Sequence, residues 1–161
     1  MNASTFIKVA LIDQMQQIAD LGLWYHVAKL IPSGVELLAR VVERNENDGF
    51  TWGERNHENL AISDYVPIGT FCEKYFPPDY YKHSACHGAV SFFSVSGRRW
   101  LTSDPDHAEK HLTEDADGFR FIHVPTWFAD FKAACETVLK EIDSGKIKDI
   151  EVLKMVKQQK K

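Results

Sequence analysis

The sequence predicts a mainly α-helical fold, an antiparallel helical bundle into which a small antiparallel β-sheet is inserted (α+β). Two long apolar series with helical spacing occupy residues 5–45, and a third occupies residues 126–143. Between them, residues 89–124 contain β-branched and aromatic runs separated by turn residues. The 161 residues are 44% apolar, which suffices for one hydrophobic core, so we expect a single domain over 1–161.

The first predicted helix begins with Ser4 or Thr5 as its N-cap and ends near Gly22. Its apolar residues recur every three or four positions: Ile7, Leu11, Met15, Ile18, Leu21 and Tyr25. A second, antiparallel helix follows, with Trp24, Val27, Ala28, Ile31, Val35, Leu38, Val41 and Val42 on one face. Pro32 predicts that this helix kinks or restarts near Ser33-Gly34. We favour a kink, because the apolar series keeps its phase across the proline.

The middle of the chain contains a loop and two shorter helices. No sustained period is present from residue 45 to about residue 62, which predicts the loop. Ser63-Asp64 is expected to cap a short helix that Pro77-Pro78 ends. Asp79 is expected to cap the next helix, and the bundle is predicted to use residues 64–88 as its middle part.

The β insertion, about residues 89–124, is predicted to start with a hairpin. Its strands are residues 90–95 and 98–102, joined by a turn at Ser96-Gly97, and a third strand at residues 119–125 is expected to join them. The acidic loop from Ser103 to Asp117 contains His107 and His111. We expect these two histidines and His123 to be exposed to solvent.

The last predicted core helix begins at Thr126 and ends at Ser144-Gly145. Its buried face is predicted to hold Phe128, Phe131, Ala134, Cys135, Val138, Leu139 and Ile142. Trp127 belongs to the same aromatic series, which is more typical of a core than of a ligand platform. The lysine-rich residues 146–161 are expected to fray.

Composition limits the classes of function. A net charge of −4 and a pI near 6.0 argue against a protein that coats nucleic acid through its overall charge. Three cysteines without paired spacing favour a reducing compartment. The sequence lacks a basic leader and an apolar run of membrane-spanning length, so we expect a cytoplasmic protein that does not enter a membrane.

The stretch Lys82-His83-Ser84-Ala85-Cys86-His87, followed by Gly88, gathers the strongest candidates for chemistry. On a helix, these basic and thiol side chains lie within reach of one another. The stretch resembles the motif of the HEPN domains, small helical bundles whose catalytic members carry arginine, a polar residue, three further residues and histidine. Lys82 stands at the arginine position, His83 at the polar position and His87 at the closing histidine. Lysine departs from the pattern, because it lacks the planar two-pronged donor set of arginine.

The resemblance implies a metal-independent ribonuclease that needs no cofactor and works as a homodimer on RNA. His87 would act as general base on the ribose 2′-hydroxyl, Lys82 would stabilise charge on the phosphate, and His83 would orient one of them. The alternative is a catalytically inactive nucleotide-binding or protein-interaction module on the same bundle, in which lysine marks lost activity.

Other interpretations of the same residues remain open. The cluster is also compatible with a purely structural role, with both histidines at a helix end and Cys86 in the core. His83 and His87 are four residues apart, as two zinc ligands are, although Cys86 does not share their face. A Cys–His nucleophilic pair has less support. Arg98, Arg99 and Trp100 could bind phosphate and stack a base, or could protect an edge strand with charge.

Overall fold

The computed structural model describes residues 1–46, 65–78, 80 and 99–152 of the chain. Helices account for 68% of these described residues, so the prediction of a mainly helical protein is confirmed. The first predicted helix is a continuous rod of α1 (Ala3–Phe6), a π-helical segment η1 (Ile7–Gln14) and α2 (Met15–Asp20). It ends at Gly22, whose φ of +74° is the left-handed conformation that glycine adopts without strain.

The spacing of the buried residues explains the π-helical segment. The rod buries residues at strict four-residue intervals, namely Ala3, Ile7, Leu11, Met15 and Ala19. In an α-helix of 3.6 residues per turn, each such step drifts by about 40°, or about 160° over the whole series. The wider turn of a π-helix, with its i→i+5 hydrogen bonds, drifts in the opposite direction. The combination therefore keeps all five side chains on the core side.

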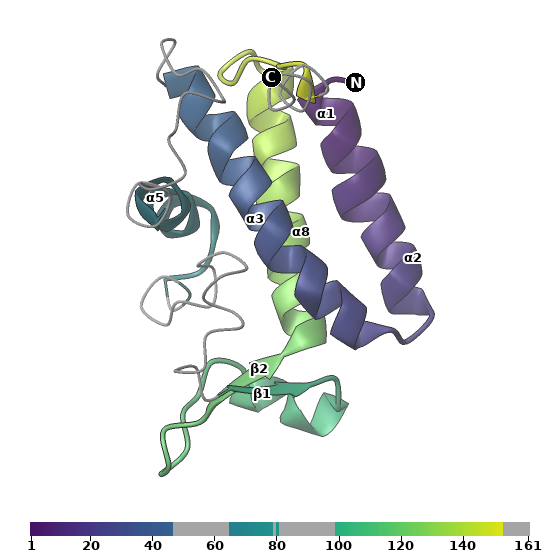
Figure 1. Ribbon diagram of the computed structural model, residues 1–161, viewed down its shortest axis with the longest axis vertical. Helices are drawn as coiled ribbons and strands as arrows, with labels where there is room; N and C mark the ends of the chain where they lie inside the picture. Colours follow the sequence, from purple (N-terminus) through teal and green to yellow (C-terminus); the bar gives the residue numbers. More distant parts are fainter. Residues whose placement is uncertain (47–64, 79, 81–98, 153–161) are drawn as a thin grey trace, which may run out of the picture.

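The second helix, α3 (Trp24–Glu46), runs antiparallel to this rod (Figure 1). It continues through Pro32 without a break, and the kink expected there stays a prediction. Every member of that series from Val27 to Val42 is buried, and only Trp24 is partly exposed. Gly34 lets α3 approach its neighbours, because a Cβ there would lie 2.5 Å from Cζ of Phe131.

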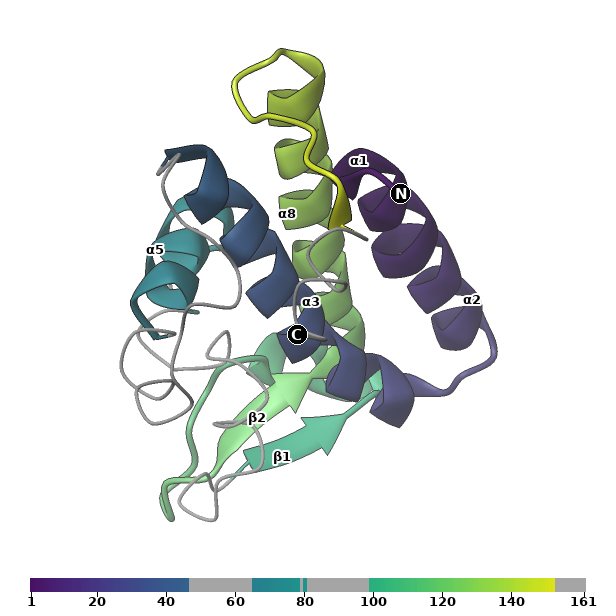
Figure 2. The same ribbon diagram turned by 45° about the horizontal axis from the view of Figure 1, so that its top comes forward.

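Two further helices complete the described bundle. The short middle helix α5 (Tyr65–Tyr75) ends before Pro77, as predicted, and buries Phe71 and Cys72 against the core. The last helix, α8 (Val124–Asp143), buries its whole predicted apolar face together with Trp127. α8 packs against both α3 and the first helical rod (Figures 1 and 2).

The predicted N-cap of α8 is wrong by three residues. The N-cap is His123 rather than Thr126, and the Nδ1 atom of His123 lies 3.4 Å from the backbone nitrogen of Thr126, which donates to it. Pro125 fits within the first turn, because the first backbone N–H groups of a helix need no partner inside it. The strand before α8 therefore runs directly into the helix.

The predicted antiparallel arrangement of the sheet is wrong. Strand β1 (Arg99–Thr102) pairs in parallel with β2 (Arg120–His123), with Trp100 opposite Phe121. The connection contains the 3₁₀ helix η3 (Pro105–Lys110), and it has the dozen or more residues that a parallel crossover requires. The predicted first hairpin strand, residues 90–95, lies outside the described residues.

The prediction of a frayed tail is wrong for residues 146–152. Ile147 and Val152 are buried, and the backbone nitrogen of Val152 donates to the carbonyl oxygen of Met1 at 2.9 Å. The Asp149 carboxylate accepts hydrogen bonds from the backbone nitrogen of Ser4 at 2.9 Å and from its hydroxyl at 2.6 Å. Asp149 thus caps the first helix, so the expected N-caps, Ser4 and Thr5, are also wrong. Residues 153–161 lie outside the described part.

Candidate functional site

The predicted catalytic residues Lys82, His83 and His87 lie outside the described residues, and so does Arg98. Arg99 is described as the first residue of β1. The side chain of Trp100 is 54% exposed, and its ring centroid lies 5.6 Å from that of Phe119. The structure therefore describes the chain on either side of the predicted site, including the exposed Trp100 and the partly exposed Phe119.

A buried hydrogen-bond network lies directly before the predicted motif in the chain. Tyr80 is 1% exposed, and its hydroxyl lies 2.6 Å from Oδ2 of Asp130 and 2.6 Å from Nε2 of His111. The hydroxyl donates its proton to the carboxylate, so it accepts a hydrogen bond from the imidazole. Tyr80 thus ties the chain just before Lys82 to both α8 and the connection between the strands.

The hydrogen bond at the second ring nitrogen of His111, Nδ1, defines the tautomer of this histidine. The backbone N–H of His123 donates to Nδ1 of His111 at 3.0 Å, so Nδ1 carries no proton and Nε2 carries one. Burial, and next the charge of His123, lower the pKa of His111 from 6.5 to about 4. His111 is therefore neutral at pH 7 and holds Tyr80 rather than acting as a base toward it.

His123 extends the network to the start of α8. Its Nδ1 lies 2.7 Å from the Thr126 hydroxyl and also accepts from the Thr126 backbone, so its proton is on Nε2. The ring is 5% exposed, and among the described residues Nε2 has no hydrogen-bond partner. Burial lowers the pKa of His123; nearby, the charge of Asp104 acts to raise it and that of His107 to lower it. His123 is thus a neutral cap that points a buried donor away from the helix.

The predicted exposure of the three histidines is wrong for His123, which is buried, whereas His111 is partly exposed. His107 is partly exposed, and its Nδ1 lies 3.1 Å from the hydroxyl of Thr102, at the end of β1. Within the described ranges, no group of three His, Cys, Asp or Glu side chains is arranged to hold a metal ion. His111 and His123 thus belong to one hydrogen-bonded network with Tyr80 and Asp130, whereas His107 bonds to Thr102.

Both flanks of residues 81–98 are held at the same end of the molecule. Tyr80 is bonded to His111 and Asp130, and Arg99 is paired with Arg120 in the sheet that leads into α8. Figures 1 and 2 show the two strands at the N-terminal end of α8. A stretch anchored at both ends on rigid elements is a common arrangement for functional groups.

The sequence did not predict one network of four side chains, namely Tyr80, His111, Asp130 and His123. One local signal was present, because His123 stands directly before a Pro-Thr pair at a helix start, where capping side chains occur. The pairing of Tyr80 with residues 31 and 50 positions away has no local signal. It depends on the packing of α8.

In comparisons with known proteins, no protein-family model, curated protein or solved structure matches this chain. None of the helices within the described ranges combines the length and the apolar character that crossing a membrane requires.

Proposed function

We propose that this protein is a HEPN-like domain that cleaves single-stranded RNA through Lys82, His83 and His87. The observation that carries the proposal is the hydroxyl of Tyr80, held between His111 and Asp130 two residues before Lys82. Catalytic groups need a supporting shell that fixes the backbone from which they project. The network supplies that support where the chain enters the motif.

The order of the helices is a second line of support. The α1–α2 rod and α3 form two long antiparallel helices before the motif, and α8 packs on them after it. This is the order that the resemblance to HEPN domains implies. The small parallel sheet is an addition to that bundle.

The proposed chemistry uses the side chains of the motif and water. His87 takes the proton of the ribose 2′-hydroxyl, and the resulting oxygen attacks the adjacent phosphorus. The bond to the 5′-oxygen breaks, and that oxygen takes up a proton from water. Lys82 stabilises the charge that develops on the phosphate oxygens, and His83 orients one of the two groups.

We further propose that the active form is a two-fold dimer. Two motif stretches brought together double the number of cationic groups around one phosphate, which a single short motif does not provide. Light scattering at tens of micromolar protein should give twice the mass of the chain. A monomer under these conditions would contradict this part of the proposal.

A second candidate function, RNA or nucleotide binding without cleavage, is favoured by Trp100. Its exposed ring beside Phe119 offers a surface on which a base can stack, next to Arg99 in the same strand. We expect Trp100→Ala to weaken RNA binding about 5- to 160-fold, the range that one stacked base contributes. Trp100→Phe should retain part of the affinity, because an aromatic face remains.

Cleavage assays separate the two functions. The full chain is incubated with stoichiometric single-stranded RNA in the presence of a chelator, and the products are resolved by length. We expect cleavage that His87→Ala abolishes and Lys82→Ala strongly reduces. The matched controls are His26→Ala and Lys140→Ala, which alter exposed residues on α3 and α8 and should cleave as wild type does.

Two results would remove the ribonuclease proposal. The first is the absence of cleavage by wild type at stoichiometric concentration, and the second is cleavage that persists in His87→Ala. RNA binding that depends on Trp100, without any cleavage, would establish the second candidate function instead.

A further inference from the structure

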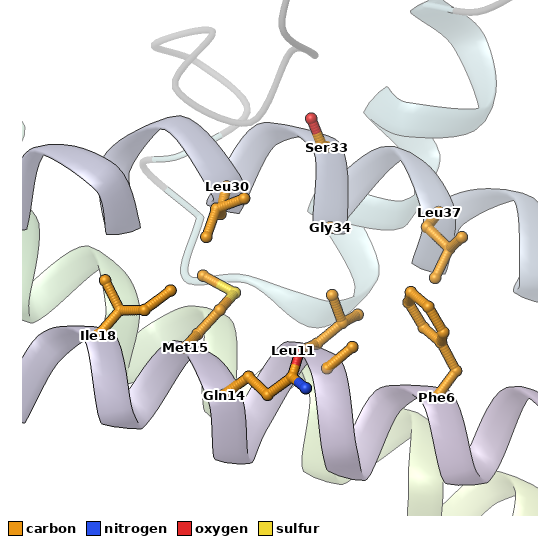
Figure 3. Close-up of a pocket in the computed structure, with 10 residues that line it drawn as sticks. Phe6, Leu11, Gln14, Met15, Ile18, Leu30, Ser33, Gly34 and Leu37 are labelled. Carbon is orange, nitrogen blue, oxygen red and sulfur yellow. The ribbon is translucent and has the colours of Figure 1, made fainter.

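An apolar cavity of about 360 Å³ lies between the first helical rod and α3. Figure 3 shows side chains from the two helices pointing toward one another across it. The apolar side chains among them are Phe6, Leu11, Met15, Ile18, Leu30 and Leu37. Leu30 is 41% exposed, so the cavity is open to solvent along α3.

Both walls of this cavity use irregular helical segments. On one side the π-helical segment η1 contributes Ala10, Leu11 and Gln14. On the other side the lining residues Ser33 and Gly34 directly follow Pro32, which removes one backbone hydrogen bond from α3. π-helical turns are rare and occur frequently at functional sites. The π-helical segment on one wall therefore makes this cavity a candidate binding site.

We propose that the cavity binds one small, uncharged, elongated apolar molecule, namely a single alkyl or acyl chain of medium length with a neutral polar end. None of the described residues that line the cavity carries a charge. The amide of Gln14 lies beside Leu11 and offers both a donor and an acceptor to a hydroxyl or carbonyl group.

The dimensions favour a single chain over a protein segment. The lining residues run from Leu30 to Leu37 on α3 and from Phe6 to Ile18 on the rod, which corresponds to roughly 10–18 Å along the helices. A helix with a diameter of 10–12 Å would need roughly 800–2,000 Å³ over that length. A volume of about 360 Å³ instead lies in the range of small-molecule pockets.

A series of n-alcohols from pentanol to dodecanol tests the proposal on the full chain by isothermal titration calorimetry. We expect saturable binding at one site, with affinity rising about fourfold for each added methylene, as for full burial of that group. The rise should stop at the chain length that fills the cavity. Adsorption to exposed apolar surface would give no such plateau, because it has no length limit.

Two variants locate the site. Ala10→Phe places a ring in the cavity and should weaken decanol binding at least tenfold, whereas Val9→Phe alters an exposed neighbour on the same segment and should bind decanol as wild type does. Leu30→Gln is a second, partly exposed change that introduces a polar wall and should also weaken binding. Circular dichroism verifies that each variant is folded.

The proposal is overturned if no alcohol in the series saturates the wild type. It is also overturned if affinity rises with chain length without a plateau, or if folded Ala10→Phe and Leu30→Gln bind decanol as tightly as Val9→Phe does.

Discussion

Replacing Tyr80 by phenylalanine removes one oxygen atom and keeps the ring, so it isolates the two hydrogen bonds of the hydroxyl. One bond joins the hydroxyl to the Asp130 carboxylate and the other to Nε2 of His111, each at 2.6 Å. A bond to a charged group contributes about 1.5–3 kcal/mol and a neutral one about 0.5–1.5 kcal/mol. Asp130 and His111 are partly exposed, so water recovers part of this energy. We expect Tyr80→Phe to lower the free energy of unfolding by about 2–3 kcal/mol.

Urea unfolding followed by circular dichroism measures this change, provided that the denaturant slope is unchanged. The matched control is Tyr25→Phe, because Tyr25 is 56% exposed and a change at the surface should stay within about 0.5 kcal/mol. Imidazole ¹⁵N shifts should also show the Nε2–H tautomer of His111 at pH 7. If Tyr80→Phe costs no more than Tyr25→Phe, the network does not hold the chain before the motif, and the support for the proposed function is lost.

Three further perturbations test the fold. The pKa of His111 is lowered to about 4 in the folded chain, so the unfolded chain binds the proton of this imidazole more tightly. After allowance for partial exposure, the free energy of unfolding should therefore fall by about 1–2 kcal/mol as pH drops from 6.5 to 4. The same pH profile in His111→Gln as in wild type would contradict this. In urea unfolding, Gly34→Ala should cost about 1–3 kcal/mol through its clash with Phe131, whereas Gly69→Ala, with nothing within 4 Å, should gain about 0.5–1 kcal/mol; equal effects would refute the close packing. Asp149→Ala should remove the cap of the first helix and cost about 0.5–2 kcal/mol, and an unchanged thermal midpoint would show that the cap contributes nothing.

Helix positions and buried faces could be predicted because they depend on local periodicity. Val35 and Phe131 are fully buried, and each belongs to a predicted apolar series that helical spacing places on one face. The end of α8 at Gly145 was predicted correctly for the same kind of reason, since its φ of +75° is one that glycine adopts readily.

The direction of the strands could not be predicted from local pattern. Alternation identifies which face of a strand is apolar, but it does not identify the partner strand or its direction. Trp100 pairs with Phe121 because the connection through η3 returns the chain in parallel. The hydrogen bonds of His111 were missed for a related reason, because its partners are Tyr80 and the backbone of β2, both distant in sequence.

The π-helical segment, which was not predicted, did leave a trace in the sequence. The buried positions from Ala3 to Ala19 repeat every four residues, a spacing that a uniform α-helix cannot keep on one side. Counting such intervals would have indicated the π-helical segment. The cap of that same helix by Asp149, from the opposite end of the chain, leaves no comparable signal.

The Tyr80 network also links stability to the proposed activity, and the two can be measured on one variant. If the network positions the motif, Tyr80→Phe should slow RNA cleavage even at a temperature where it is fully folded, whereas Tyr25→Phe should change neither property. If the network only stabilises the bundle, folded Tyr80→Phe should cleave at the wild-type rate despite its lower unfolding free energy. The first outcome would make Tyr80 a positioning residue, because its hydroxyl acts through His111 and Asp130 and not on the substrate. The second would leave the catalytic assignment to depend on Lys82 and His87 alone.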